Sequence, residues 1–336
     1  MKTVKRLFIW GFVLLLTAAA AGLLGAAYWG WQRPVPMAGE VADYVVDPGS
    51  TPRQIAQVMR EAGIQLHPDA FVALARLSGL DKQLKAGAYE AKSGDTPWRL
   101  LERMASGDMT QVRLTFPEGW TYAQIRAALR ASPDVRQTLD DTSDAELLQR
   151  LGMDVRSPEG LFYPDTYVFS PGTSDFDILR RAALAGSQIL ERAWANRDTD
   201  LPLKSPYEAL ILASIVERET GHHADRSRVA GVFINRLRIG MPLQTDPTVI
   251  YGMGDAYQGR LRKRDLERDT PWNTYTRPGL PPTPIASPGK AALLATLHPE
   301  DHDFLYFVSR GDGTSEFSRN LAAHNRAVHK YILKRQ

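Results

Sequence analysis

The sequence predicts an α+β protein in which helices outweigh strands, and three observations predict this class. Residues 44–64 run from a short apolar stretch through a turn into an amphipathic stretch, as a strand, turn and helix would. Residues 205–221 form a long apolar stretch with helix-capping residues at both ends. Two short runs near 304–309 and 314–318 predict a small β-sheet within a helix-rich C-terminal part.

The first 31 residues predict a short cytoplasmic tail and a transmembrane anchor. Residues 7–31 carry no charge, and at about 1.5 Å per residue they are long enough to cross a hydrocarbon core of about 30 Å. Basic residues precede this run and aromatic residues close it, which favours an orientation with the rest of the chain outside the cytoplasm: Lys2, Lys5, Arg6, Tyr28, Trp29 and Trp31. We therefore expect a single-pass protein of the inner (cytoplasmic) membrane, with its main domain on the periplasmic side. A cleaved signal peptide with a small-residue site near 18–20 is the alternative, although the apolar run is long for one.

The composition is that of an ordinary globular protein, with 43% hydrophobic and 24% charged residues. The net charge of +3 comes without a basic, aromatic-rich stripe, so we expect no nucleic-acid partner. The absence of cysteine excludes disulfides, thiol catalysis and cysteine-ligated zinc. The run His222, His223 and Asp225 is not a metal-binding motif, because adjacent histidines point apart and no HExxH is present. We expect neither a metal nor a cofactor.

Changes in composition divide the rest of the chain into segments. Residues 32–43 are expected to be a tether, 44–110 a small α+β module, and 111–336 the main domain, with 111–200 as a leading subdomain and 201–336 as the core. The run VDPGSTPRQIA in the small module resembles the LysM-like module. Because this pattern is weakly specific, a packing unit without a carbohydrate ligand is the alternative.

The stretch KSPYEALILASIVERETG, residues 204–221, carries clear helix boundaries. Ser205 is the expected N-cap, Pro206 takes the first helical position, and Glu208 would complete a capping box. Gly221 is expected to end the helix. Because the residues between are nearly all apolar, the helix should be buried on most sides.

Two glutamates near the end of this helix are candidates for acid–base chemistry. At about 100° per residue, Glu217 and Glu219 point in nearly opposite directions, so only one of them can face a given cleft. Glu217 shares its stripe with Ala213 and Ser214, whose small side chains would leave room for a ligand. Burial raises the pKa of a carboxyl group, and a glutamic acid that is protonated near neutral pH can act as a general acid. The alternative is a solvated or salt-bridged residue at a helix end, and we expect Glu219 to pair with an arginine.

Downstream segments combine aromatic rings with amides and hydroxyls. They lie in QTDPT, 244–248, and in the proline-rich run 271–289. This combination suits a sugar, because aromatic faces stack on C–H groups while polar groups bind hydroxyls. Core packing is the alternative for the aromatic residues.

Several long motifs, in order along the chain, resemble the YceG-like endolytic murein transglycosylases (the MltG group). They are EGLFYPDTY, LASIVERET, GVFINRLRIGMPLQTDPTVIYGMG, NTYTRPGLPPTPIASPG, LYFVSRGDGTSEFS and NLAAHN. The resemblance implies a membrane-anchored enzyme that cuts peptidoglycan glycan strands internally and leaves 1,6-anhydro-N-acetylmuramoyl ends. The family's catalytic glutamate falls in IVE, which is Glu217 here. The implied partners are glycan strands and the membrane, with peptidoglycan synthases as further candidates.

A single carboxyl group would suffice for this lytic reaction. Glu217 would protonate the bridging oxygen of the MurNAc–GlcNAc bond, and the sugar's own C6 hydroxyl would trap the resulting centre. We expect further substrate-binding or supporting residues in the cleft: Asn235, Gln244, Tyr275 and Asn320, with Glu159 and Asp246 as candidates for a supporting carboxylate. One alternative is a hydrolase with Asp246 or Glu159 as its base, and another is a non-catalytic anchored scaffold that binds glycan.

Overall fold

The structure is a computed structural model. It describes residues 10, 13–14, 17, 21–22, 25, 28, 30–37, 39–219 and 223–333. The expected membrane anchor, 7–31, therefore lies largely outside the described residues. In the part of the chain that is described, no helix combines the length and the hydropathy that a membrane span needs.

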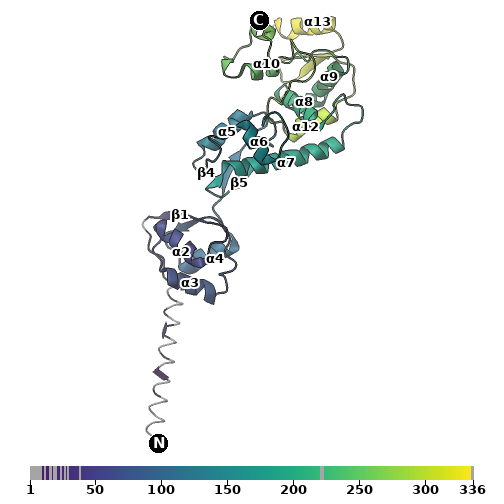
Figure 1. Ribbon diagram of the computed structural model, residues 1–336. Coiled ribbons are helices and arrows are strands. Elements are labelled where there is room, and N and C mark those ends of the chain that lie inside the picture. The colour runs from purple at the N-terminus through teal and green to yellow at the C-terminus, as the bar shows by residue number, and fades with distance from the viewer. Residues whose placement is uncertain are drawn as a thin grey trace. The chain divides into compact units, whose positions relative to one another are not determined.

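The chain folds into two compact units (Figure 1). The first unit holds residues up to 112 together with 168–173, and the second holds 113–167 and 174–336. Helices and short two-stranded sheets occur in both, which confirms the predicted α+β class.

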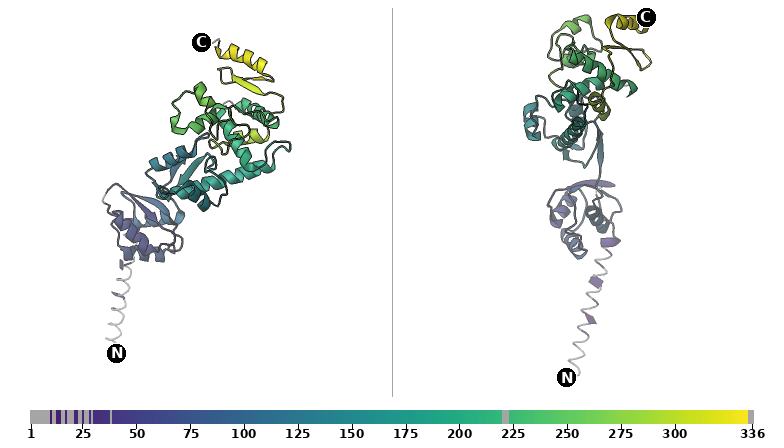
Figure 2. Two further views of the ribbon diagram at one scale, coloured as in Figure 1. Left: turned by 45° about the horizontal axis from the view of Figure 1, so that its top comes forward. Right: turned by 90° about the vertical axis from the view of Figure 1, so that its right-hand side faces the viewer.

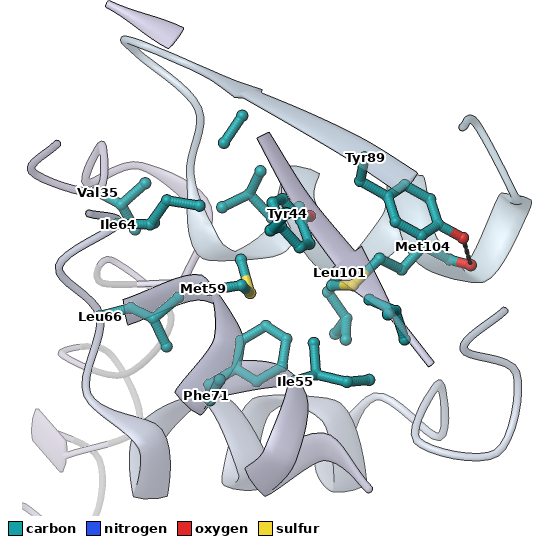
Figure 3. Packing of buried hydrophobic residues seen from close by; sticks show 14 of the residues in the cluster. Val35, Tyr44, Ile55, Met59, Ile64, Leu66, Phe71, Tyr89, Leu101 and Met104 are labelled. Carbon is teal, nitrogen blue, oxygen red and sulfur yellow. Dashed lines mark hydrogen bonds between the residues drawn. The ribbon is translucent and has the colours of Figure 1, made fainter. Parts of the chain in front are cut away.

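The first unit packs three helices against an antiparallel strand pair. Its elements are β1 (Val41–Val46), α2 (Pro52–Glu61), α3 (Pro68–Leu77), β2 (Gly87–Lys92) and α4 (Pro97–Ser106). Strand β1 pairs with β2 from Val41 opposite Lys92 to Val46 opposite Gly87. Figure 3 shows the apolar side chains that meet between these elements, including the fully buried Ile55, Phe71 and Tyr89.

Helix boundaries in this unit follow local sequence signals. Thr51 caps α2, because its hydroxyl accepts the backbone N–H of Gln54 while the Gln54 side chain accepts that of Thr51. Pro52 then occupies the first helical turn, where its missing N–H costs nothing. Such caps fix where each helix begins, and the apolar spacing decides which face enters the core.

The second unit contains most of the helices that the structure describes. It begins with α5 (Tyr122–Ala131), β4 (Val135–Arg136), α6 (Asp144–Leu151) and α7 (Asp175–Ala195), whereas the strands β3 (Val112–Thr115), β5 (Thr166–Phe169) and β6 (Thr173–Ser174) each have residues in both units. It continues with α8 (Pro206–Glu219), η1 (His223–Asp225), α9 (Arg226–Arg238), α10 (Asp246–Met253), η2 (Gly254–Ala256), α11 (Lys263–Glu267) and α12 (Lys290–Leu297). It ends with β7 (Tyr306–Ser309), β8 (Ser315–Ser318) and α13 (Leu321–Tyr331). Strand β3 pairs with β5, and β4 pairs with β6.

Helix α8 is the centre of this unit, and α7, α9, α10 and α12 pack against it (Figure 1). Every residue from 209 to 216 is buried, as the apolar sequence predicts. At its start the Ser205 hydroxyl accepts the Glu208 N–H, as expected, whereas the Glu208 carboxylate accepts the N–H of Lys204 rather than that of Ser205. The expected helix stop, Gly221, lies outside the described residues.

The predicted C-terminal β-sheet is confirmed. Strands β7 and β8 pair antiparallel, from Tyr306 opposite Ser318 to Ser309 opposite Ser315. Helix α13 lies beside this hairpin in both views of Figure 2. The hairpin contributes Phe307 and Phe317 to the core that also contains the α8 side chains.

Candidate active site

Glu217 lies near the end of α8, with 8% of its side chain exposed. Its Oε2 accepts a hydrogen bond from the backbone N–H of Gly289, with an N–O distance of 3.0 Å. Its Oε1 lies 3.7 Å from a guanidinium nitrogen of Arg226, whose side chain is 10% exposed. The carboxyl group is therefore enclosed, and each of its oxygens faces a positive or partly positive group.

Two loops hold this arrangement together. The N–H of Gly119 donates to the carbonyl oxygen of Ser287 at 2.8 Å, and the N–H of Ser287 donates to that of Trp120 at 2.7 Å. The guanidinium of Arg218, the residue after Glu217, donates to the Gly119 carbonyl oxygen at 3.2 Å. These bonds bring the turn PEGW, 117–120, against the end of α8 and the start of α12.

Glu118, in that turn, is a carboxylate that no sequence motif indicated. A Cβ atom added at Gly289 would lie 1.8 Å from the Glu118 Oε1, so the glycine is needed for this close approach. The adjacent Gly119 has a φ of 77°, a left-handed conformation that glycine adopts without strain. Two carboxyl groups thus meet at one residue: Glu217 at the Gly289 N–H and Glu118 over its Cα. The signal in the sequence was a Glu-Gly pair in a turn, which carries no information about its distant partner.

The pKa of Glu217 is raised above its ordinary value, chiefly because burial disfavours the charged form. The Gly289 N–H and the Arg226 charge oppose this shift, and the nearby negative charge of Glu118 adds to it. A raised pKa agrees with the prediction that Glu217 is a general acid.

The space for a ligand that was expected beside Glu217 is absent. Ser214 is fully buried, and its hydroxyl accepts the Ile285 N–H at 3.0 Å. The small residues of the stripe make space for the chain at 285–289, not for a ligand.

Glu219 points to a different part of the unit, as the helical spacing predicts. It accepts a hydrogen bond from the Thr245 hydroxyl. Burial raises its pKa to about 7, against the lowering effect of the Thr245 hydrogen bond. The prediction that Glu219 forms an ion pair with an arginine is wrong for the residues that the structure describes. Arg236 lies near, but its guanidinium donates to the carbonyl oxygens of Leu305, Pro242 and Leu243.

A pocket of about 340 Å³ opens at Glu219. Its lining includes three predicted site residues, Gln244, Asp246 and Tyr275, and also Tyr306 and His324. The Tyr275 hydroxyl donates to Asp246 Oδ1 at 2.6 Å. The structure therefore brings these three residues together, but around Glu219; the described contacts of Glu217 include none of them.

Backbone strain marks the same pocket. Gln244 has a φ of 51°, and among the described residues it is the one non-glycine residue with a positive φ. This conformation costs an ordinary side chain about 1–2 kcal/mol. Its N–H donates to the Thr274 carbonyl oxygen at 3.1 Å, which fixes the loop, while the side chain is exposed. Strain of this kind is retained where a side chain must face a particular direction.

Two other predicted site residues, Asn235 and Asn320, have structural roles, and neither is among the described contacts of Glu217. The Asn235 amide donates to the carbonyl oxygens of His302 and Phe304, at 2.7 and 3.2 Å, and so anchors the segment before β7. The Asn320 side chain accepts the Ala323 N–H at 2.9 Å and caps α13. These contacts do not support the expectation that either amide faces a glycan.

Glu159 is also bound internally, with 3% exposure. One oxygen accepts the Tyr122 N–H at 2.9 Å and the other accepts the Tyr251 hydroxyl at 3.1 Å, which ties α5 to α10. Burial raises its pKa to about 7. Both oxygens of Glu159 are occupied by hydrogen bonds that join two helices of the fold, so these contacts do not support Glu159 as the supporting carboxylate.

The predicted absence of a metal concerns a region that is only partly described, since His222 is outside it. Asp225 accepts the Ser315 N–H at 2.7 Å. Within the residues that the structure describes, no three histidine, aspartate or glutamate side chains are grouped to hold a metal ion.

Comparison with known proteins decides the family. A sequence model of the YceG-like family matches residues 44–330, most of the chain. The chain belongs to the YceG-like family. The match includes both loops that enclose Glu217, the turn at 117–120 and the segment at 285–289, as well as the pocket at Glu219.

Curated relatives carry one name. An endolytic murein transglycosylase of Bacillus subtilis (strain 168) is 32% identical over 302 residues, covering 84% of this chain and 83% of that protein. An endolytic murein transglycosylase of Streptococcus pneumoniae (strain D39) is 26% identical, covering 97% of this chain and 65% of that protein. The crystal structure of a yceG-like protein, lmo1499 of Listeria monocytogenes, is similar with a TM-score of 0.52 and 28% identity. That similarity covers 85% of this chain and 98% of the Listeria chain, and it supports the YceG-like fold.

Proposed function

We propose that this protein is an endolytic murein transglycosylase, a lyase that cleaves MurNAc–GlcNAc bonds within nascent glycan strands and so limits their length. The family and the relatives' name support the reaction class. The structural observation that carries the proposal is the enclosed carboxyl group of Glu217, hydrogen-bonded to Gly289 and facing Arg226. Its raised pKa suits a group that must hold a proton near neutral pH.

The reaction then needs one carboxyl group in two roles. Glu217 gives its proton to the bridging oxygen, and the bond from that oxygen to C1 of MurNAc breaks. The Gly289 N–H and Arg226 stabilise the carboxylate that remains. The C6 hydroxyl of the same sugar attacks C1, and Glu217 takes the hydroxyl proton, which restores the acid and closes the 1,6-anhydro ring. Because the nucleophile is tethered to the electrophile, no water has to be positioned.

We propose the pocket at Glu219 as a glycan-binding subsite. The exposed Gln244 amide and the hydroxyl of Tyr275 are groups that bind sugar hydroxyls and acetamido groups. The ring of Tyr275 offers an apolar face to the C–H groups of a sugar. A volume of about 340 Å³ suits a small part of a strand rather than a long segment.

We also propose that residues 7–31 anchor the protein in the inner membrane, with both units on the periplasmic side, and that the first unit is LysM-like. The uncharged run of the sequence supports the anchor. Protease added to intact spheroplasts should degrade both units, whereas a cytoplasmic control protein should survive. Protection of the units would overturn this orientation.

End-group analysis tests the proposed reaction. Purified peptidoglycan is digested with the full-length protein in detergent, and the new ends are analysed by mass spectrometry with and without borohydride reduction. Anhydro-muramoyl ends, which borohydride leaves unchanged, are the expected product. Reducing muramic ends would indicate a hydrolase, and intact strands would indicate a glycan-binding scaffold.

A further inference from the structure

Glu118 has an unusual position for an exposed carboxylate. Its turn is fixed on both sides, because Gly119 and Trp120 exchange backbone hydrogen bonds with Ser287 and Arg218 also binds the Gly119 carbonyl oxygen. The Glu118 carboxyl group itself forms no hydrogen bond or ion pair with the residues that the structure describes. The backbone is thus held by several bonds, while the charged group it presents is left free.

This free group lies against the residue that binds the proposed acid. A Cβ atom at Gly289 would meet the Glu118 carboxyl group at 1.8 Å, and a Cβ atom at Gly119 would lie 3.9 Å from the Glu217 Cγ. The Gly289 N–H meanwhile donates to Glu217. Glu118 and Glu217 are therefore neighbours that differ in environment, since Glu118 is exposed whereas 8% of the Glu217 side chain is exposed.

Other polar groups in this cluster also have unused hydrogen-bonding capacity. The Nε of Arg226 and the hydroxyl of Ser287 are buried, and neither has a hydrogen-bond partner among the described residues. Buried polar atoms are normally paired, and these two unpaired ones belong to the residue that faces Glu217 and to the residue whose backbone binds the Glu118 turn, so they point to a functional rather than a purely structural cluster. The exposed carboxylate of this cluster, Glu118, can act on a bound sugar.

We propose that Glu118 is a second carboxylate of the catalytic centre, whose negative charge stabilises the positive charge that develops at C1 and the ring oxygen of the cleaved MurNAc. This role rests on the proposed transglycosylase function. No atom is transferred to or from Glu118: Glu217 still gives and recovers the proton, and the C6 hydroxyl still forms the new bond. The negative charge acts on the oxocarbenium-like state more strongly than on the neutral substrate, so it lowers the barrier rather than the KM.

The same charge has a second, measurable effect on the acid. Like charge raises the pKa of Glu217, and the Glu118 carboxylate is one of the contributors. Removing it should lower the pKa of Glu217. The basic limb of the pH–kcat profile, where the acid loses its proton, should then move to lower pH.

The test compares Glu118→Gln with Glu191→Gln in the full-length protein. Glu191 is an exposed residue of α7 in the same unit, with no described ion pair, so its substitution is the matched control. Glu118→Gln is expected to lower kcat roughly ten- to hundredfold, to leave KM and Tm nearly unchanged, and to shift the basic limb downward. Wild-type kcat, or a lowered Tm as the sole effect, would overturn the role and leave Glu118 as an exposed charge of the turn at 117–120.

A second variant displaces the carboxylate without removing it. Gly289→Ala keeps the N–H that binds Glu217, and its φ of −75° suits alanine, but the new methyl group must push the flexible end of Glu118 aside. It should lower kcat in the wild type and have no further effect in a Glu118→Ala background. If Gly289→Ala lowers kcat by the same factor in the wild type and in the Glu118→Ala background, the proposal is contradicted. If the wild type leaves only reducing ends, the transglycosylase function fails and this role fails with it; anhydro ends together with an unaffected Glu118→Gln variant overturn this role alone.

Discussion

The Oε2 of Glu217 accepts the backbone N–H of Gly289 at 3.0 Å, which joins the end of α8 to the start of α12. A backbone donor holds the carboxyl group in one orientation without adding a second titratable group. Burial raises the pKa of this carboxyl group, and the donor limits the shift. The balance leaves the pKa of Glu217 above its ordinary value, while the Gly289 N–H and Arg226 stabilise the conjugate base.

Arg226 should shift the pKa of Glu217 in the direction opposite to the shift caused by Glu118. Its charge lowers the pKa of Glu217, so Arg226→Gln should raise that pKa. A general acid with a higher pKa stays protonated to a higher pH, and the basic limb of the pH–kcat profile should move upward. The profile of Arg192→Gln, at an exposed position on α7, should match the wild type. A downward shift in Arg226→Gln would contradict the described contact.

Glu219 should contribute to binding rather than to proton transfer. Its pKa is raised to about 7, so it is largely protonated below that pH, and glutamine mimics the protonated form. Glu219→Gln should keep kcat within about threefold of the wild type and raise KM, because it lines the pocket but lies apart from Glu217. Steady-state rates on uncross-linked glycan strands give both parameters. A loss of kcat in this variant, with activity retained in Glu217→Gln, would reverse the two roles.

The backbone conformation of Gln244 should lower the stability of the protein, while its side chain should improve glycan binding. Gln244→Gly relieves the positive φ of 51° and should stabilise the protein by about 1 kcal/mol, apart from the added entropy of glycine. Gln244→Ala is the matched control, since it removes the amide but keeps the strained backbone. Both variants should raise KM, and the glycine variant should have the higher free energy of unfolding in urea. Equal stability of the two would mean that the backbone is not strained there.

Glu159 should make stability fall as the pH rises. Its pKa is raised from 4.5 to about 7, so the folded state binds the proton more tightly than the unfolded state does. This contribution is fully present below pH 4.5 and is lost as the pH rises through about 7; it amounts to roughly 3 kcal/mol. Urea unfolding at pH 4 and pH 8 should therefore show a smaller difference for Glu159→Gln than for the wild type. The Glu191→Gln control should keep the full difference between pH 4 and pH 8. If Glu159→Gln also keeps the full difference, the burial of this group is contradicted.

Local sequence signals predicted the elements of the second unit well. The cap at Ser205, the buried face of α8 and the β7–β8 hairpin all depend on residues close together in the sequence. Helical spacing also predicted that Glu217 and Glu219 face different surroundings. In each case the physical cause acts within one element or between neighbouring ones.

The sequence could not show which side of α8 carries the pocket. Gln244, Asp246 and Tyr275 were recognisable as polar and aromatic residues suited to a sugar, yet they surround Glu219. The small side chain of Ser214 suggested open space, but the chain at Ile285 fills it. Glu118 had no local signal at all, because its position depends on a turn meeting Gly289 far along the chain. Long-range contacts of this kind follow from tertiary packing, which no periodicity encodes.

The most direct test of the account is the rate at which Glu217→Gln forms anhydro-muramoyl ends from purified peptidoglycan. Glutamine fits the space and can still accept the Gly289 hydrogen bond, but its amide protons are not acidic enough to be transferred to the leaving oxygen. We predict a rate at least about a hundredfold below that of the wild type, with an unchanged Tm. Anhydro ends produced at the wild-type rate by a folded Glu217→Gln protein would contradict the central claim.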